Sequence, residues 1–263
     1  MTTANVGALL RTWRERRGIS QLELAGRADS SSRHISFVEN GRSRPSEEMV
    51  LRLADHLDVP VRDRNALLMA AGYAPRYPHT PLDAPSMAVL REGLERLMSA
   101  YEPYPALVVD AAYDVVAANR GVMMLLDGMP DHLLAPPLNA MRITLHPEGL
   151  ARRIHNLREW RGHLLAQMER QIALARSSAL RALYEEVAAY PVAERPGDRE
   201  PLEEAVPYIA LPLRIEHDGQ ILSFVSSIST FNTPMDVTVA ELAIETLLPA
   251  DPATAKYLRS AGS

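Results

Sequence analysis

Residues 20–41, "SQLELAGRADSSSRHISFVENG", carry the signals of two short helices joined by a tight turn. Ser20 with Glu23 three residues later is the pattern of a capping box, which predicts that a helix begins here. The serines after "GRAD" can cap a second helix, and the Asn-Gly pair would end it. In that helix Ile35 and Val38 have the spacing of one buried face. The stretch therefore predicts a helix-turn-helix unit whose second helix has a polar N-terminal end.

Three more helices are expected around this unit. Apolar residues recur at helical spacing over residues 6–17, and Gly18 would end that helix. The Pro-Ser pair at 45–46 introduces a fourth helix, and a fifth is expected over residues 63–71. Residues 1–72 are therefore expected to form an all-α domain of five helices.

A proline-rich segment follows the helical domain. Residues 73–86 contain four prolines, which are too many for a helix because each proline removes a backbone donor and fixes its own φ angle. We expect this segment to be a linker. The chain therefore has two predicted domains, at residues 1–72 and at residues 87–263.

The second domain mixes the patterns of helices and strands. A helix over residues 87–100 leads to strands in "ALVV" and "AYDVVAAN", and residues 119–190 are mostly helical, with a break at "HPEG" and a long helix over 149–176. The segment "YIALPLRIEHDGQILSFVSSISTF" has a hairpin signal at Asp218-Gly219. "AELAIETLLP" is expected to be the last strand, with a helix as the alternative. These patterns predict an α+β fold with an antiparallel sheet whose first and last strands are neighbours.

The composition excludes several kinds of site. Because the chain has no cysteine, it cannot form a disulfide framework, a thiolate zinc site, an iron–sulfur cluster or a cysteine nucleophile. The longest apolar run is interrupted by Asp110 and Asp114, well short of the ~20 residues that a membrane span needs. Arginines break every apolar stretch of residues 1–17, so no secretory signal is expected there. We therefore expect a cytoplasmic protein without membrane contact.

Positive charge is concentrated in the first domain. Residues 1–45 contain eight arginines and four acidic residues, a charge of about +4, whereas the whole chain has a net charge of −5. This asymmetry is typical of a nucleic-acid-binding segment joined to an acidic body. Chance clustering of arginines on a solvated face is the alternative that charge alone leaves open.

The polar end of the second helix has the arrangement of a DNA-reading helix. When two helices are joined by a turn of three or four residues, the N-terminal end of the second can enter the major groove. Residues 7–72 resemble the helix-turn-helix domain of lambdoid phage repressors and Cro, known as the XRE family. The resemblance rests on Gln21, Leu24-Ala25, Ile35-Ser36, Glu39 and Gly41. Asp29 and Ser30 stand where the family commonly has Gly and Val.

This resemblance implies roles for the polar residues of the unit. Base edges would be read by Ser32, Arg33, Ser36 and Phe37. DNA phosphates would be bound by Gln21, Asn40, Arg42 and Arg44. The fork of an arginine matches guanine O6 and N7, whereas phosphate contacts position a protein without specifying the sequence. Glu39 resembles an internal acid of the family, with Arg14 as its expected partner.

Two stretches near the ends of the second domain carry a second resemblance. "EPYPALVVDAAYDVVAANRGVMMLL" and "STFNTPMDVTVAELAIETLLPADPATA" resemble the ligand-binding domain of MmyB-like transcription regulators, while residues 127–200 fit more loosely. This resemblance implies a PAS-like fold with a pocket for a fatty acid or a similar apolar molecule.

Several polar residues near "HPEG" are candidates for binding the carboxylate of a fatty acid. A carboxylate needs a cation or a hydrogen-bond donor when it leaves water. The candidates for this role are Arg142, His146 and Asn156. Trp160 is the aromatic residue that could close the edge of the pocket. The serines of "SFVSSIST" and several methionines could line the space, although solvent-facing serines and core methionines are an equally good reading.

The sequence contains no pattern of an enzyme. GxSxG, HExxH, GxGxxG and Walker motifs are all missing, so no catalytic residue is expected. His155 and His163 would lie about 80° apart on a helix, and no fourth ligand is evident beside them and His146, so no metal is expected. Apart from a fatty acid as ligand, no cofactor is expected.

The combined patterns predict a sequence-specific transcription regulator that responds to a fatty acid or a similar apolar effector. Since one such domain reads only one half-site, a homodimer on a double-stranded DNA operator is expected. The alternative is a DNA-binding regulator whose second domain only dimerises or binds another protein, without a ligand.

Overall fold

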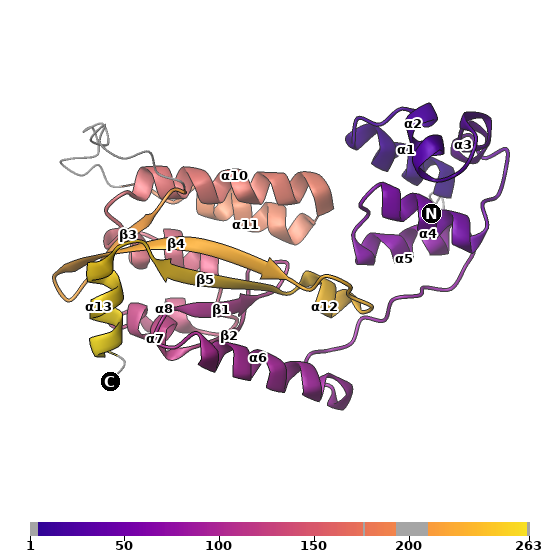
Figure 1. Cartoon of the computed structure of the whole chain (residues 1–263). Coiled ribbons are helices and arrows are strands. Elements are labelled where there is room, and N and C mark those ends of the chain that lie inside the picture. The colour runs from indigo at the N-terminus through magenta and orange to yellow at the C-terminus, as the bar shows by residue number, and fades with distance from the viewer. Residues whose placement is uncertain (1–4, 176, 193–209, 262–263) are drawn as a thin grey trace. The chain divides into compact units, whose positions relative to one another are not determined.

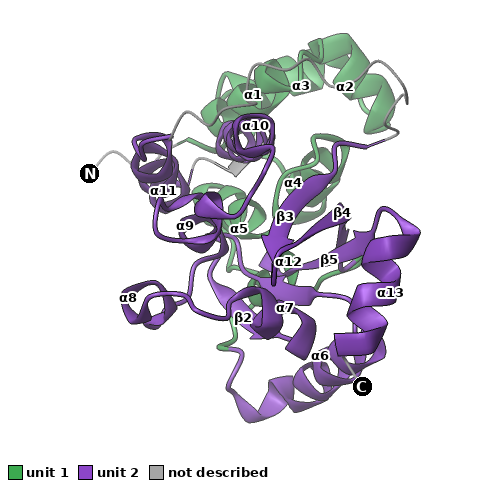
Figure 2. Cartoon of the chain, turned by 90° about the vertical axis from the view of Figure 1, so that its left-hand side faces the viewer, with its two compact units in different colours: residues 1–81, 232–240 green, residues 82–231, 241–263 purple. Residues whose placement is uncertain are grey.

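The structure, a computed structural model, describes residues 5–175, 177–192 and 210–261 of the chain. They fall into two compact units, which Figure 2 colours separately. Unit 1 comprises residues 1–81 and 232–240, and unit 2 comprises residues 82–231 and 241–263. The predicted boundaries assigned residues 232–240 to the second domain, whereas in the structure they pack with unit 1.

Unit 1 is built from helices, as the sequence predicted. They are α1 (Val6–Arg16), α2 (Gln21–Arg27), α3 (Ser32–Glu39), α4 (Glu47–His56), α5 (Val61–Ala70) and, at the boundary with unit 2, α12 (Val237–Glu241). Three serines cap these helices by accepting a backbone N–H three residues later, at 3.1–3.2 Å: Ser20, Ser31 and Ser46. The predicted capping box at α2 is only half formed, because the carboxylate of Glu23 accepts a hydrogen bond from Arg27 at 2.7 Å.

The core of unit 1 is one cluster to which each of α1 to α5 contributes. Helix α1 approaches α3 unusually closely at Gly7. A Cβ atom on Gly7 would lie 2.2 Å from the carbonyl oxygen of Val38 and 2.7 Å from that of Glu39. Only glycine allows this approach, so Gly7 helps to set the position of α3.

The end of the proline-rich segment is hydrogen-bonded to the loop before α12. The N–H of Val237 donates to the carbonyl oxygen of Pro78 at 2.8 Å, and the hydroxyl of Thr80 donates to the carboxylate of Asp236 at 2.6 Å. The hydroxyl of Thr238 donates back to the carbonyl oxygen of Thr80 at 2.7 Å. These bonds explain why the two segments belong to one unit.

Unit 2 has the α+β fold that the sequence predicted. Its helical elements are η1 (Pro85–Met87), α6 (Ala88–Ala100), α7 (Arg120–Leu125), α8 (Asp131–Leu134), α9 (Ala140–Leu145), η2 (Leu150–Arg152), α10 (Leu157–Ala175), α11 (Ser178–Ala188) and α13 (Pro252–Ala261). Its strands are β1 (Ala106–Val109), β2 (Val115–Ala118), β3 (Leu213–His217), β4 (Gln220–Thr230) and β5 (Ala243–Pro249).

Within the described residues these strands form one antiparallel sheet in the order β2-β1-β5-β4-β3. The first strand β1 and the last strand β5 are neighbours at its centre, as expected. Figure 1 shows α10 and α11 along one face of the sheet and α6 along the other. Residues alternate between these faces: Ile244 of β5 packs in the cluster of α6, whereas Leu247 packs in the cluster of α10 and α11.

The predicted hairpin between β3 and β4 is confirmed. Asp218 and Gly219 have φ angles of 48° and 72°, and His217 pairs with Gln220 across the turn. A two-residue turn of this kind requires positive φ at both positions, which an Asp-Gly pair tolerates. The segment quoted for this hairpin begins at Tyr208, and residues 208–209 lie outside the described residues.

The long helix predicted over residues 149–176 begins later than expected. The N–H of His155 donates to the carbonyl oxygen of Arg214, and the N–H of Glu216 donates to that of Arg153, both at 2.8 Å. The segment before α10 is therefore held along β3. Because its partners lie about sixty residues away in the sequence, helical periodicity alone could not show this.

Helix α13 was not predicted. The carboxylate of Asp251 accepts hydrogen bonds from the N–H of Thr254 at 2.7 Å and from its hydroxyl at 3.0 Å. Pro252 occupies the first position of the helix, where its missing N–H costs nothing. This local start signal was present in the sequence and was overlooked.

Candidate DNA interface and ligand cavity

Helix α3 divides into a buried face and an exposed N-terminal end. Ile35 and Val38 are buried in the core of unit 1, while Ser32 and Arg33 are exposed. Ser36 and Phe37 are half-buried beside them. The turn before α3 places Asp29 at a φ of 48°, the left-handed conformation in which the family more commonly has glycine. The turn thus presents the polar end of α3 to solvent.

A buried ion pair holds α3 to α1. The guanidinium of Arg14 donates to the two carboxylate oxygens of Glu39 at 2.6 and 2.9 Å and to the carbonyl oxygen of Ile19 at 2.9 Å. The hydrogen bond from Arg14 to Glu39 raises the pKa of Arg14. The expected partnership of these two residues is confirmed. Gln21 also donates to Glu39, at 2.8 Å, which the sequence did not suggest.

The guanidinium of Arg33 lies over the ring of Phe37, 5.3 Å from its centroid. The two residues are one helical turn apart, so they meet on the same face of α3. A cation over an aromatic face is attracted by the ring quadrupole. This contact restricts the arginine fork before any DNA is bound.

The candidates for phosphate binding differ in how many contacts their side chains already make within the protein. Arg44 donates to the carbonyl oxygens of Ala71 and Gly72, at 3.0 and 3.4 Å, and lies over the ring of Tyr73. Asn40 donates to the carbonyl oxygen of Ser36 at 2.8 Å, inside its own helix.

Arg42 is exposed on the segment after α3. Within the described residues its side chain has no hydrogen bond or ion pair. Its guanidinium is therefore available to a ligand, and Arg42 is the least constrained of the phosphate candidates.

Unit 2 contains a partly open apolar cavity of about 110 Å³ between the sheet and its helices. Its wall is formed almost entirely by aliphatic side chains from β1, β2, β3 and β5 on one side and from α7, α9 and α10 on the other. The lining includes Leu107, Val115, Val122, Met123, Met141, Ile143, Leu164, Ile215 and Leu247. Such a space can hold a small apolar molecule.

The predicted ligand residues are placed differently relative to this cavity. Trp160 is 3% exposed and lines it. Asn156 is not among the lining residues: its amide donates to the carbonyl oxygen of Pro212 at 2.8 Å and accepts from the N–H of Arg214 at 3.0 Å. Asn156 thus fastens the start of α10 to β3.

Arg142 and His146 also lie outside the cavity lining. Arg142 donates to both carboxylate oxygens of Glu186 at 2.7 and 2.8 Å, which lowers the pKa of Glu186. The hydroxyl of Tyr190 donates to the same carboxylate at 2.6 Å; burial and this bond raise the pKa of Tyr190 to about 12. The ring of His146 packs edge-on against Tyr190. A ligand-binding role for Arg142, His146 and Asn156 stays a prediction.

Comparison with known families covers both units. Residues 90–261 match the MmyB-like transcription regulator ligand binding domain, and residues 5–67 match a helix-turn-helix domain. The chain belongs to the MmyB-like transcription regulators. Both matched domains are of the regulator type, so the protein is a DNA-binding transcription regulator and not an enzyme.

Other comparisons add little to this assignment. No curated protein matches the chain. A solved structure of the clp gene regulator ClgR from Corynebacterium glutamicum does match this MmyB-like regulator, with 28% sequence identity. The match covers 37% of this chain and 90% of the ClgR chain. The TM-score is 0.23, too low for any structural argument.

Glu245 is a cavity residue of this MmyB-like regulator that the sequence analysis missed. It lies on the central strand β5 and lines the apolar cavity. Its carboxylate accepts a hydrogen bond from the hydroxyl of Ser226 at 2.7 Å, and burial raises its pKa. A strand that alternates faces would be expected to have an apolar residue here, between Ala243 and Leu247, so the break in alternation was the available signal.

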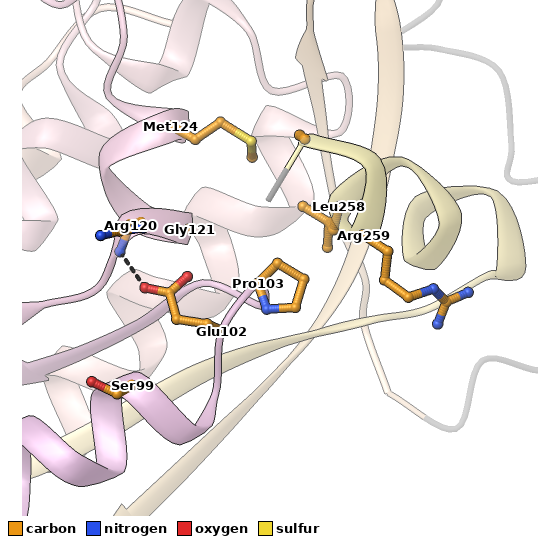
Figure 3. A pocket seen from close by; sticks show the side chains of 9 residues that line it. Ser99, Glu102, Pro103, Arg120, Gly121, Met124, Leu258 and Arg259 are labelled. Atoms are coloured by element: carbon orange, nitrogen blue, oxygen red, sulfur yellow. Dashed lines mark hydrogen bonds between the residues drawn. The ribbon is translucent and has the colours of Figure 1, made fainter. Parts of the chain in front are cut away.

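A wider hollow of about 720 Å³ lies at the surface of unit 2, between the end of α6, α7 and α13 (Figure 3). Its walls mix charged and apolar side chains, including Glu102, Arg120 and Leu258. The backbone N–H of Arg120 donates to Glu102 at 2.9 Å. This mixed surface lacks the apolar enclosure that an apolar ligand needs.

One cluster in this MmyB-like regulator consists of side chains of the kinds that bind metal ions. His132, His146 and Glu148 have ligand atoms within 4.8 Å of one another. The backbone N–H of Glu148 already donates to Nδ1 of His146 at 3.1 Å, which occupies the lone pair of that nitrogen. Two of the histidines considered in the sequence lie elsewhere: His155 is paired with Glu216, and His163 stacks on Trp160.

No helix of the described residues combines the length and the apolar character that crossing a bilayer needs.

Proposed function

We propose that this regulator reads an operator in double-stranded DNA with α3 and that an apolar small molecule in the cavity of unit 2 controls this binding. The observation that carries the proposal is the division of α3. Ile35 and Val38 are buried, whereas Ser32 and Arg33 are exposed at the N-terminal end, where a recognition helix meets base edges.

The proposal divides the polar residues of unit 1 between two tasks. Bases are read by Ser32, Arg33, Ser36 and Phe37. Phosphates are bound by Gln21, Asn40, Arg42 and Arg44. The contact between Arg33 and Phe37 supports the first task, because an arginine held in place loses less freedom when it pairs with guanine. The exposed Arg42 supports the second.

The effector in this proposal is a fatty acid or a similar apolar molecule. The apolar wall of the cavity and the position of Trp160 within it support an apolar body for the ligand. Binding changes DNA affinity if the ligand favours one state of the protein over another, which requires different contacts in the two states. The protein acts as a cytoplasmic homodimer in this proposal, since two copies of α3 are needed to read a two-fold symmetric operator.

Selection of bound DNA from random fragments tests the first half of the proposal. The full chain is expected to enrich one motif with two related half-sites, and light scattering of the complex should show two protein chains per site. Recovery of unrelated fragments with equal affinity would exclude sequence-specific reading.

Mass spectrometry of the purified, denatured protein tests the second half. A co-purifying apolar molecule, or a shift in Tm with added decanoic acid, is expected. Trp160 fluorescence in a Trp13→Phe variant should change in parallel, because Trp160 lines the cavity and Trp13 belongs to unit 1. If nothing co-purifies and neither signal responds, unit 2 is a dimerisation or protein-interaction module without a ligand.

A further inference from the structure

The proposed base readers on α3 differ in how sharply they can discriminate between bases. Ser32 and Ser36 end in hydroxyl groups, which both donate and accept and therefore fit several base edges. The hydroxyl of Ser36 also accepts a hydrogen bond from the amide of Asn40 at 3.3 Å. An arginine fork matches guanine, and an aromatic ring packs against the methyl group of thymine. The preference of α3 for particular bases should therefore depend mainly on Arg33 and Phe37.

Arg33 presents free hydrogen-bond donors from a restricted position. It is exposed, and in the part of the chain that the structure describes its side chain has no hydrogen bond or ion pair. Its guanidinium lies over the ring of Phe37, 5.3 Å from the centroid. The ring attracts the cation through its π face and does not use up the N–H groups in conventional hydrogen bonds. All five donors of the arginine fork therefore remain available to a base.

The separation of the two groups fits neighbouring base pairs. Residues 33 and 37 are one turn apart on the same face of α3. Successive bases of a strand rise by about 3.4 Å, so two bases with another between them are about 6.8 Å apart. The 5.3 Å between the guanidinium and the ring centroid is shorter than this. An arginine that reads one base pair therefore holds the ring beside the next pair.

We infer that α3 reads a G·C pair directly next to an A·T pair. Arg33 donates to O6 and N7 of the guanine, and the ring of Phe37 packs against the C5-methyl group of the adjacent thymine. The inference rests on the proposed function of α3 as the DNA-reading helix. One arrangement serves both contacts, because the guanidinium can stay over the ring while its N–H groups point to the guanine.

The chemistry of the major groove explains why the second contact selects thymine. The methyl group of thymine is the one apolar group that the four bases present there. Phe37 is only half-buried, so part of its ring is open to such a group. A cytosine at this position would place its N4 amino donor against an apolar ring, where the donor has no partner. The discrimination should therefore follow the methyl group itself.

The probes are altered copies of the operator that selection from random fragments yields. In one copy, uracil replaces the thymine beside the guanine in each half-site, which removes only the methyl group. In a second copy, 7-deazaguanine replaces the guanine, which removes only the N7 acceptor. Both probes keep the phosphates and the Watson–Crick pairing of the operator. They therefore test the inference with the wild-type, full-length protein and without any substitution in it.

The dissociation constants should reveal the two contacts separately. The wild-type protein should bind the uracil probe about fourfold more weakly for each methyl group removed. It should bind the 7-deazaguanine probe about tenfold more weakly for each guanine replaced. Phe37→Ala should lose the response to uracil, and Arg33→Ala should lose the response to 7-deazaguanine.

Arg42→Ala is the matched control for these variants. It removes a proposed phosphate contact, so it should weaken binding to every probe and leave both ratios as in the wild type. Each variant is judged by the ratio of two dissociation constants measured on the same preparation. A smaller folded fraction therefore cannot imitate the loss of a base contact.

The outcomes separate the inference from the proposed function. If selection enriches a motif without a G·C pair next to an A·T pair, the helix reads DNA but the inference about the base step is wrong. The same conclusion follows if either altered probe binds like the operator, or if the response to uracil persists in Phe37→Ala. If selection enriches no motif, the proposed function itself is wrong, and the inference fails with it.

Discussion

The guanidinium of Arg14 on α1 donates two hydrogen bonds, at 2.6 and 2.9 Å, to the carboxylate of Glu39 at the end of α3. The side chains are 11% and 2% exposed, so neither charge has water as an alternative partner. Gln21, the first residue of α2, donates to the same carboxylate. One ion pair thus joins the three helices that position the proposed DNA-reading surface.

Glu39→Gln should destabilise unit 1 by about 3 kcal/mol, because the largely buried Arg14 charge then keeps only a 3.8 Å contact with the half-exposed Glu15 as its acidic partner. Urea unfolding followed by Trp13 fluorescence in a Trp160→Phe background measures this. The control is Glu23→Gln, whose side chain is 48% exposed beside Arg27 and should cost less than about 1 kcal/mol. Equal losses of unfolding free energy in both variants would show that the buried pair stabilises the fold no more than an exposed pair does.

Gly7→Ala should cost about 1–3 kcal/mol, because the new Cβ would overlap the carbonyl oxygen of Val38 and push α3 away from α1. Gly26→Ala is the matched control. Gly26 lies on α2 with no atom within 4 Å of the Cβ position, so alanine there should be neutral or stabilising. Midpoints of urea unfolding distinguish the two, and a Gly7→Ala protein as stable as wild type would contradict the close contact.

Arg44→Ala should weaken the fold as well as DNA binding, whereas Arg42→Ala should affect only DNA binding. Arg44 donates a hydrogen bond to the carbonyl oxygen of Ala71 at the end of α5, and its guanidinium lies over the ring of Tyr73. Its removal should therefore cost about 1–2 kcal/mol of unfolding free energy. Arg42→Ala should stay within about 0.5 kcal/mol of wild type. Thermal unfolding without DNA tests the difference, and identical Tm values for both variants would refute it.

Acid should remove the stabilising effect of the Arg142–Glu186 pair. Arg142 lowers the pKa of Glu186 below its ordinary 4.5, so the pair stabilises the fold above that pH, and the effect disappears as the pH falls through the lowered pKa. Both side chains are about 40% exposed, so Arg142→Met should cost at most about 1 kcal/mol at neutral pH. Unfolding in urea at about pH 7 and about pH 3 should show a smaller cost at the lower pH; an unchanged cost would exclude the mechanism.

Local signals account for the parts of the fold that the sequence could predict. Serine caps began α2, α3 and α4, and the Asp218-Gly219 turn marked the β3–β4 hairpin. These features depend on residues a few positions apart. The pairing of the segment before α10 with β3 depends on residues about sixty positions apart, and periodicity predicted a continuous helix there instead.

The residues of the proposed sites could be predicted only where a sequence motif fixes their positions. The spacing around α3 placed Ser32 and Arg33 on the exposed end of that helix, and the structure agrees with their exposure. For the cavity, the expected cation was Arg142, whose charge is instead balanced by Glu186, with Arg142 on α9 and Glu186 on α11. Glu245 was missed because an acidic residue was not expected inside an apolar pocket.

The comparison of Arg33→Ala with Arg42→Ala on the selected operator and on random DNA tests the central claim most directly. Arg33→Ala should lose about 1–3 kcal/mol on the operator and little on random DNA, because it removes a base contact. Arg42→Ala should weaken both complexes alike and reduce the salt dependence by about one phosphate contact. Equal losses on operator and random DNA for both variants would contradict the claim that α3 reads the sequence through Arg33.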